Sequence, residues 1–116
     1  MTSLVSSSCE ACQVGAPLLS QEQLNELLPS IPEWLLVNEL GVNQLCRSYD
    51  FDNFAEALAF TNLVADLAEQ EGHHPALLLE WGRVTVRWWT HKIKGLHRND
   101  AVMAAKTDLL FQRRAS

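Results

Sequence analysis

The sequence predicts an α+β domain: one four-stranded antiparallel sheet made of two hairpins, with three helices on one face, in the order α-β-β-α-β-β-α. Apolar residues recur at helical spacing in three stretches, two pairs of strand-like runs stand between them, and a glycine marks the turn of each pair. With 116 residues, 47% of them hydrophobic, the chain can build one core but not two. We expect a flexible, Ser-rich lead-in over residues 1–19 and a single domain over residues 20–116.

The first helix and hairpin are predicted from capping and turn residues. Ser20 and Gln23 form a capping box, in which each side chain accepts from the backbone N–H of the other, and Pro29 ends the short helix that follows. Tyr49 and its apolar neighbours share one side of a strand, but Arg47 has the same parity, so the register is left open. The two strands and their turn are expected at Trp34–Val37, Asn43–Tyr49 and Asn38–Gly41.

The middle of the chain carries the clearest helical pattern. Asn53 and Glu56 form a capping pair at its start, and the pattern extends over Phe54–Gln70. Gly72 supplies the left-handed residue that commonly ends a helix. Apolar residues cover so much of the circumference that we expect this helix to pack on two sides, one of which covers the sheet.

A second hairpin and a last helix complete the domain. Leu77–Trp81 is expected to pair with Val84–His91 through a type II′ turn with Gly82 at its first position, so that His91 closes the strand. The loop, the helix cap and the first-turn acid that follow are expected at Lys92–Arg98, Asn99 and Asp100. Such a sheet has exposed edges and a bare face, which favours self-association.

Charge and hydropathy exclude several classes of partner. The formal net charge of −5 gives no broad basic field, so we expect no nucleic-acid partner. No apolar run is long enough to cross a bilayer, and the N-terminus does not resemble a signal peptide, so we expect no membrane partner and a cytoplasmic location. The sequence also has no phosphate-cradling glycine loop and no recognisable Ser or Cys nucleophile, which disfavours nucleotide cofactors and covalent catalysis.

The three cysteines favour reduced thiols over a disulfide framework, because their number is odd. Cys9-x-x-Cys12 has the spacing of a zinc ribbon. A ribbon needs a second pair, however, and the remaining cysteine is the isolated Cys46. An unpaired thiol pair is therefore the favoured interpretation.

Three of the four histidines lie on segments that the second hairpin would bring together. His73 and His74 follow the middle helix, and His91 ends a strand. Imidazole both gives and takes protons near neutral pH, so three of them in one cleft predict proton transfer at two points on a small substrate, as in dehydration or tautomerisation. Two alternatives stay open: the adjacent pair only stabilises the helix end by its charge, or the three histidines bind zinc.

The other ionisable residues near the three histidines are expected to be solvated or to stabilise helix ends. Glu69 and Glu71 are interpreted as solvated carboxylates at a helix end, and Asp100 as an acid in a first turn. His97 is interpreted as a solvated loop histidine.

A longer pattern connects these residues. It consists of Glu69-x-x-x-His73-His74-Pro75, then Trp81-x-x-Val84-x-Val86, then Thr90-His91-x-x-x-Gly95-Leu96-x-x-x-Asp100. The pattern closely resembles the pterin-4a-carbinolamine dehydratase family, and the lead-in with Cys9 and Cys12 is similar to that of its bacterial members. The resemblance implies an enzyme that removes water from 4a-hydroxytetrahydrobiopterin to give quinonoid dihydropterin, in support of an aromatic amino acid hydroxylase such as phenylalanine hydroxylase. It also implies a homodimer or homotetramer, with the pterin as substrate and neither a cofactor nor a metal.

The resemblance also implies roles for individual residues. His73 and His91 would do the acid and base work at the 4a-hydroxyl and N5, and His74 would orient the substrate. Glu69 would hold a histidine, and Asp100 would fix the loop after His91. The residues implied to contact the pterin are Gly72, His73, His74, Trp89, Thr90, His91 and Lys92.

The sequence departs from the family pattern at two positions. Gly72 stands where animal members carry Asp, and Ala76 stands where many members carry an acid, which weighs against a carboxylate directly beside the histidine pair. Animal members also act as dimerisation cofactors of a homeodomain transcription factor, so a binding module on the same fold is the rival hypothesis. The retained histidines favour catalysis, because a scaffold has no need for them.

Overall fold

The computed structural model describes residues 18–113, so most of the predicted lead-in, including Cys9 and Cys12, lies outside the described residues. The elements are α1 (Gln21–Leu27), β1 (Leu35–Glu39), β2 (Val42–Asp50), α2 (Phe54–Glu71), β3 (Ala76–Glu80), β4 (Arg83–Trp88) and α3 (Arg98–Arg113), with the 3₁₀-helices η2 (Leu28–Ser30) and η3 (His91–Ile93). The strands form one antiparallel sheet in the order β1-β2-β4-β3. This order of elements confirms the predicted α+β class.

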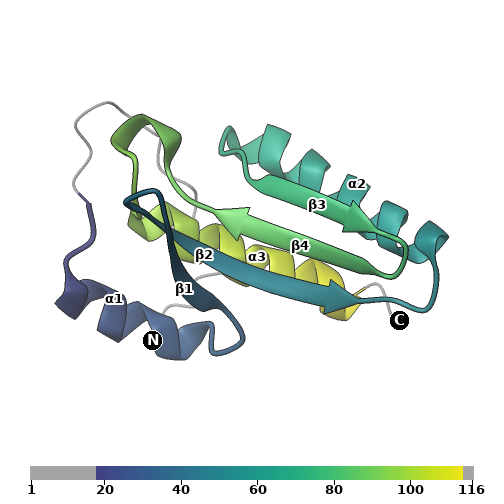
Figure 1. Ribbon diagram of the computed structural model, residues 1–116, viewed down its shortest axis with the longest axis horizontal. Helices are drawn as coiled ribbons and strands as arrows, with labels where there is room; N and C mark the ends of the chain where they lie inside the picture. The colour runs from purple at the N-terminus through teal and green to yellow at the C-terminus, as the bar shows by residue number, and fades with distance from the viewer. Residues whose placement is uncertain (1–17, 114–116) are drawn as a thin grey trace.

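The two long helices lie against the same face of the sheet (Figure 1). α2 packs on β3 and β4, and α3 packs on β2 and β4. The largest fully buried side chains between them are Trp88, Tyr49 and Phe60, and α1 adds Leu24 to the same core. Burying each large apolar side chain contributes about 1.5–3 kcal/mol to folding. Among residues 18–113, no helix has both the length and the hydrophobicity needed to cross a membrane.

The first helix and hairpin largely follow the prediction. Gln23 N donates to Ser20 Oγ and Ser20 N donates to Gln23 Oε1, which confirms the capping box. Pro29 lies in η2, directly after α1 has ended. The strands are longer than predicted because their turn has only two residues, Leu40 and Gly41, and both have the positive φ that a type I′ turn requires.

Arg47 interrupts the apolar alternation of β2 because it pairs with a carboxylate of α3. Its Nη1 donates to Asp108 Oδ1 at 2.6 Å, and its guanidinium lies 4.4 Å from the ring centroid of Tyr49. The same carboxylate accepts from the Tyr49 hydroxyl at 2.5 Å and from Trp34 Nε1 at 3.0 Å. The sequence left the register of this strand open. In the structure Arg47 lies on the helix-covered face, where its ion pair connects β2 to α3.

The phenol of Tyr49 gives a testable pH dependence. Burial, followed by the Asp108 carboxylate, raises the pKa of Tyr49 far above its ordinary value. The unfolded chain loses this proton above about pH 10 while the native protein keeps it, so the free energy of unfolding should fall as pH rises past that point. Because Tyr49 is the sole tyrosine, we expect tyrosinate absorbance to appear together with the loss of native circular dichroism. Tyrosinate formation near pH 10 in protein that is still folded would contradict this.

α2 begins and ends as the sequence predicts. Asn53 Oδ1 accepts from Glu56 N at 2.9 Å, which confirms the cap. Gly72 adopts a φ of 64° and donates its N–H to Ala68 O, which confirms the left-handed end. The chain therefore turns sharply at Gly72.

α2 packs on one side only within this chain. Its sheet-facing side buries Ala57, Phe60, Val64 and Ala68. Its outward side leaves Phe54, Leu58 and Leu63 exposed. The second packed side that the sequence predicts is therefore absent within residues 18–113 of a single chain.

The second hairpin differs from the prediction at its turn and at its end. Gly82 lacks the positive φ of a type II′ turn. A glycine is needed there because Phe51 N donates to Gly82 O, and a Cβ would lie 2.9 Å from the backbone oxygen of Phe51. β4 ends at Trp88, so His91 does not close the strand but opens η3. Alternate residues of this segment point inward: Val84, Val86, Trp88 and Thr90 are buried.

The start of α3 also differs from the prediction. The helix begins at Arg98, so Asn99 lies in its first turn and is not the cap. His97 precedes it: Asn99 N donates to His97 Nδ1 at 3.2 Å, while His97 N donates to Asp100 Oδ2 at 2.9 Å. His97 thus occupies the N-cap position: its ring accepts from the second residue of the helix, and its N–H donates to the side chain of the third. The prediction of a solvated loop histidine is therefore wrong, because His97 is half-buried and caps the helix.

Candidate functional site

A pocket of about 590 Å³ opens between the end of α2 and the segment after β4. Its volume falls in the range of roughly 300–1,000 Å³ that is usual for small-molecule sites. One segment contributes Glu71, Gly72, His73 and His74, and the other contributes Trp89, His91 and Lys92.

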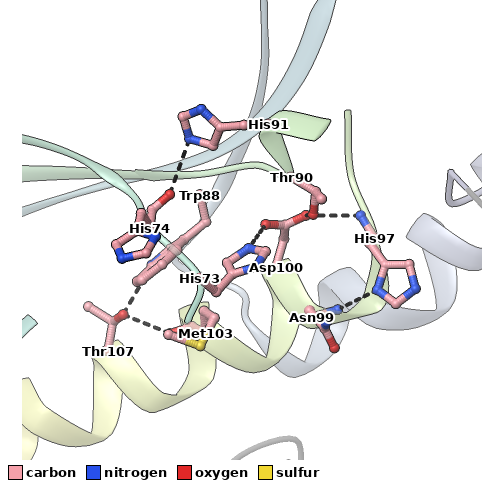
Figure 2. Close-up of polar contacts among 10 residues, drawn as sticks. All are labelled: His73, His74, Trp88, Thr90, His91, His97, Asn99, Asp100, Met103 and Thr107. Carbon is pink, nitrogen blue, oxygen red and sulfur yellow. Dashed lines mark hydrogen bonds and ion pairs between the residues drawn. The ribbon is translucent and has the colours of Figure 1, made fainter. Parts of the chain in front are cut away.

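The pairing of β3 with β4 brings these two segments together. Ala76 at the start of β3 lies opposite Arg87 near the end of β4. The residues just before β3 therefore meet the residues just after β4. The hydrogen bond between His91 Nε2 and His74 O, at 3.2 Å, closes this contact (Figure 2).

His73 forms part of the pocket wall and is almost wholly buried. Its Nε2 lies 2.6 Å from Asp100 Oδ1, and only 1% of its side chain is exposed. Its ring stacks on Trp88, with centroids 5.7 Å apart and planes at 28° (Figure 2). Trp88 Nε1 in turn donates to Thr107 Oγ1 at 3.1 Å. The hydrogen bond to Asp100 and the stacking on Trp88 thus hold the His73 ring in one position.

Asp100 connects three segments behind the pocket. Its side chain is fully buried, and besides His73 it accepts from the Thr90 hydroxyl at 2.8 Å and from His97 N at 2.9 Å. Asp100 does lie in the first turn of α3, as interpreted from the sequence, but its burial and its three bonds give it a structural role beyond that of a first-turn acid. Thr90, which we predicted to contact the substrate, is 2% exposed and is absent from the residues that line the pocket.

His74 and Glu69 form an exposed pair at the pocket mouth. His74 Nε2 lies 2.6 Å from Glu69 Oε1, with 59% and 78% of the two side chains exposed. Because a carboxylate only accepts, Nε2 carries the proton and Nδ1 of a neutral His74 holds the lone pair. Glu69 is therefore placed to orient His74, in line with the role that the sequence pattern implied.

His91 is exposed and has a defined tautomer. Its ring stacks on Trp89, with centroids 4.3 Å apart and planes at 22°. A carbonyl oxygen only accepts, so the bond to His74 O puts the proton on Nε2 and the lone pair on Nδ1. The neutral ring therefore has one basic nitrogen, held in place by a stacked indole.

The three histidines predicted to converge do line one pocket, together with Gly72, Trp89 and Lys92. Glu69, Thr90 and Asp100 lie outside its lining. Sequence reasoning missed Glu71, which lines the pocket and accepts from Lys106 Nζ. Its position directly before Gly72 was the available signal. Among residues 18–113, no three His, Cys, Asp or Glu side chains are placed to hold a metal ion.

Residues 17–110 match the model of a family described as pterin 4 alpha carbinolamine dehydratase. A relative from Saccharophagus degradans, provisionally named as such a dehydratase, is 57% identical over 97% of this chain and 99% of its own. A relative from Marinobacter nauticus with the same provisional name is 57% identical over 96% of this chain and 100% of its own. A crystal structure of a Brucella melitensis protein, described as a transcriptional coactivator/pterin dehydratase, has a TM-score of 0.73 at 30% identity and covers 81% of this chain and 98% of that one. The chain therefore belongs to the pterin-4a-carbinolamine dehydratase family.

Proposed function

We propose that this protein removes water from 4a-hydroxytetrahydrobiopterin by acid and base catalysis between histidines. The observation that carries the proposal is one small-molecule pocket lined by His73, His74 and His91, in a chain that matches the dehydratase family over residues 17–110. The pterin is the substrate, so the reaction needs no separate cofactor.

The reaction requires two proton transfers at neighbouring atoms. A base takes the proton from N5, and the electrons of that N–H bond form the N5=C4a double bond. The C4a–O bond breaks with its electrons on oxygen, and an acid supplies the proton that makes the leaving group water. Imidazoles do both because they exchange protons near neutral pH.

His91 is the proposed base at N5. Its ring lies in the pocket lining, and its bond to His74 O leaves the lone pair on Nδ1. Stacking on Trp89 restrains the ring plane, which keeps this nitrogen in one orientation. His91 would then become an imidazolium when N5 loses its proton.

His73 is the proposed acid at the departing hydroxyl. Asp100 Oδ1 accepts from His73 Nε2 at 2.6 Å, which fixes the orientation of the ring. Trp88 stacks on the ring and restrains its plane, and His73 is among the residues that line the pocket. His74, held by Glu69, would orient the substrate at the mouth of the pocket.

We propose that the product serves a pterin-dependent hydroxylase such as phenylalanine hydroxylase, in the cytoplasm. We further propose a homodimer or homotetramer. Two observations support self-association: within residues 18–113 the edge strands β1 and β3 have no pairing partner on their outer sides, and α2 exposes Phe54, Leu58 and Leu63.

The direct test is a stopped-flow assay. Freshly formed 4a-hydroxytetrahydrobiopterin is mixed with the purified protein, and the appearance of quinonoid dihydropterin is compared with the uncatalysed loss of water. We expect a rate that rises in proportion to enzyme concentration and does not change when a chelator is added. A rate equal to the uncatalysed one would contradict the proposal, and inhibition by the chelator would favour the zinc alternative.

A binding-module function is the second candidate, because the Brucella melitensis protein is described as a coactivator as well as a pterin dehydratase. A stoichiometric complex with a transcription factor, combined with no dehydration above the uncatalysed rate, would favour that function.

A further inference from the structure

Glu71 presents a carboxylate at the pocket that none of the proposed proton transfers uses. It lies in the last turn of α2, directly before Gly72, and lines the pocket. Its Oε1 accepts from Lys106 Nζ of α3, and 23% of the Glu71 side chain is exposed. Within residues 18–113, Oε2 of Glu71 has no hydrogen-bond partner. One carboxylate oxygen is thus fixed, and the other is available.

A carboxylate at the position of Glu71 is electrostatically unfavourable by itself. The C-terminal turn of a helix carries partial negative charge, which repels an acidic side chain. The last turn of α2 contains no basic residue, and the compensating charge comes from Lys106, whose side chain is only 16% exposed. The carbonyl end of α2 and the Glu71 carboxylate together give this wall of the pocket a surface that accepts hydrogen bonds.

A pterin carries a matching surface on its pyrimidine ring. The 2-amino group and N3–H present two donors side by side, at the edge of the ring that points away from C4a and N5. A carboxylate accepts such paired donors, and charge-assisted bonds of this kind are about twice as strong as neutral ones. A contact there leaves the reacting atoms directed toward the other end of the ligand.

We propose that Glu71, positioned by Lys106, recognises the 2-amino-4-oxopyrimidine edge of the pterin and determines the specificity of the pocket for 2-amino pteridines. The inference rests on the proposed function, because it takes a pterin as the ligand. Lys106 acts through Glu71 by holding Oε1, so that Oε2 is the oxygen proposed to accept from the ligand.

A plain ion pair between α2 and α3 is the alternative account of these residues. It predicts that Glu71→Gln changes stability and leaves ligand preference unchanged. The two accounts therefore differ in the ligand preference that they predict for Glu71→Gln, whereas a change in its stability would fit both.

The experiment compares the binding of pterin with that of lumazine, which has a 2-oxo group in place of the 2-amino group. Isothermal titration calorimetry is run on the wild type, Glu71→Gln, Lys106→Met and, as a matched control, the exposed Glu80→Gln at the far end of β3. We expect the wild type to bind pterin about 10-fold or more tightly than lumazine, because a carboxylate repels the 2-oxo oxygen. Glu71→Gln should lose most of this preference, because its amide donates to that oxygen. Lys106→Met should lose part of it, and Glu80→Gln none.

Wild-type binding without preference between the two ligands would overturn the inference even if no variant folded. An unchanged preference in Glu71→Gln, with dehydration intact in the wild type, would overturn the role of Glu71 and leave the dehydratase proposal standing. Absence of both pterin binding and dehydration in the wild type would overturn the two together.

Discussion

Replacing His91 with alanine is expected to lower kcat for dehydration by about 10²–10⁴-fold, because the base at N5 is lost. The fold should be retained, since His91 is exposed and, among residues 18–113, its side chain makes one hydrogen bond, to His74 O. Stopped-flow traces at saturating 4a-hydroxytetrahydrobiopterin measure the change, and circular dichroism checks the fold.

His97→Asn is the matched control for this prediction. It removes the fourth histidine, which lies outside the pocket lining. Asparagine is a good capping residue, so the start of α3 should persist. We expect the rate to stay close to that of the wild type. A His91→Ala rate within about threefold of the wild type would show that this imidazole does not transfer the N5 proton.

Asp100→Asn is expected to reduce kcat by about 100-fold or more while the protein still folds. An asparagine oxygen still accepts from Thr90 and His97, but its NH₂ group faces His73 Nε2, which then has to accept. The substitution therefore inverts the tautomer of His73 and replaces a charged hydrogen-bond partner with a neutral one. Loss of the charged hydrogen bond should also lower the free energy of unfolding by about 2 kcal/mol.

Two measurements separate a catalytic effect from a structural one. Nitrogen NMR of the imidazoles should report the changed tautomer of His73 in Asp100→Asn. Asp108→Asn is the control, because Asp108 is a partly buried carboxylate of the same helix that binds Arg47, Tyr49 and Trp34. It should lose stability and keep its activity per folded molecule. An unchanged kcat in Asp100→Asn would contradict the role of the His73–Asp100 pair.

The fold was predictable because its signals are local. A capping box, a left-handed glycine and the apolar periodicity of α2 depend on neighbours within a few residues, so Ser20, Asn53 and Gly72 mark element ends that the structure retains. The turns were less predictable. Gly82 is required by the approach of the Phe51 backbone, and that contact joins residues that only the folded sheet brings together.

The sequence predicted most of the residues that line the candidate site, but not their burial or their hydrogen-bond partners. The histidines stand in a recognisable pattern, and strand pairing brings them together. The burial of His73, the three acceptor bonds of Asp100 and the pairing of Glu71 with Lys106 all depend on α3, which is distant in sequence from the end of α2. Side-chain periodicity contains no information about such partners. Thr90 shows the same limit, because its hydroxyl turns inward to Asp100.

The central claim is that imidazoles from two separate segments meet one pterin ring. The chain has four histidines, so a titration with pterin followed by imidazole NMR, with signals assigned through single His→Gln variants, tests it directly. The account predicts that the resonances of His73, His74 and His91 shift with one common dissociation constant while those of His97 stay in place. Saturable binding of pterin with no shift in those three, or with a shift in His97 alone, would contradict it.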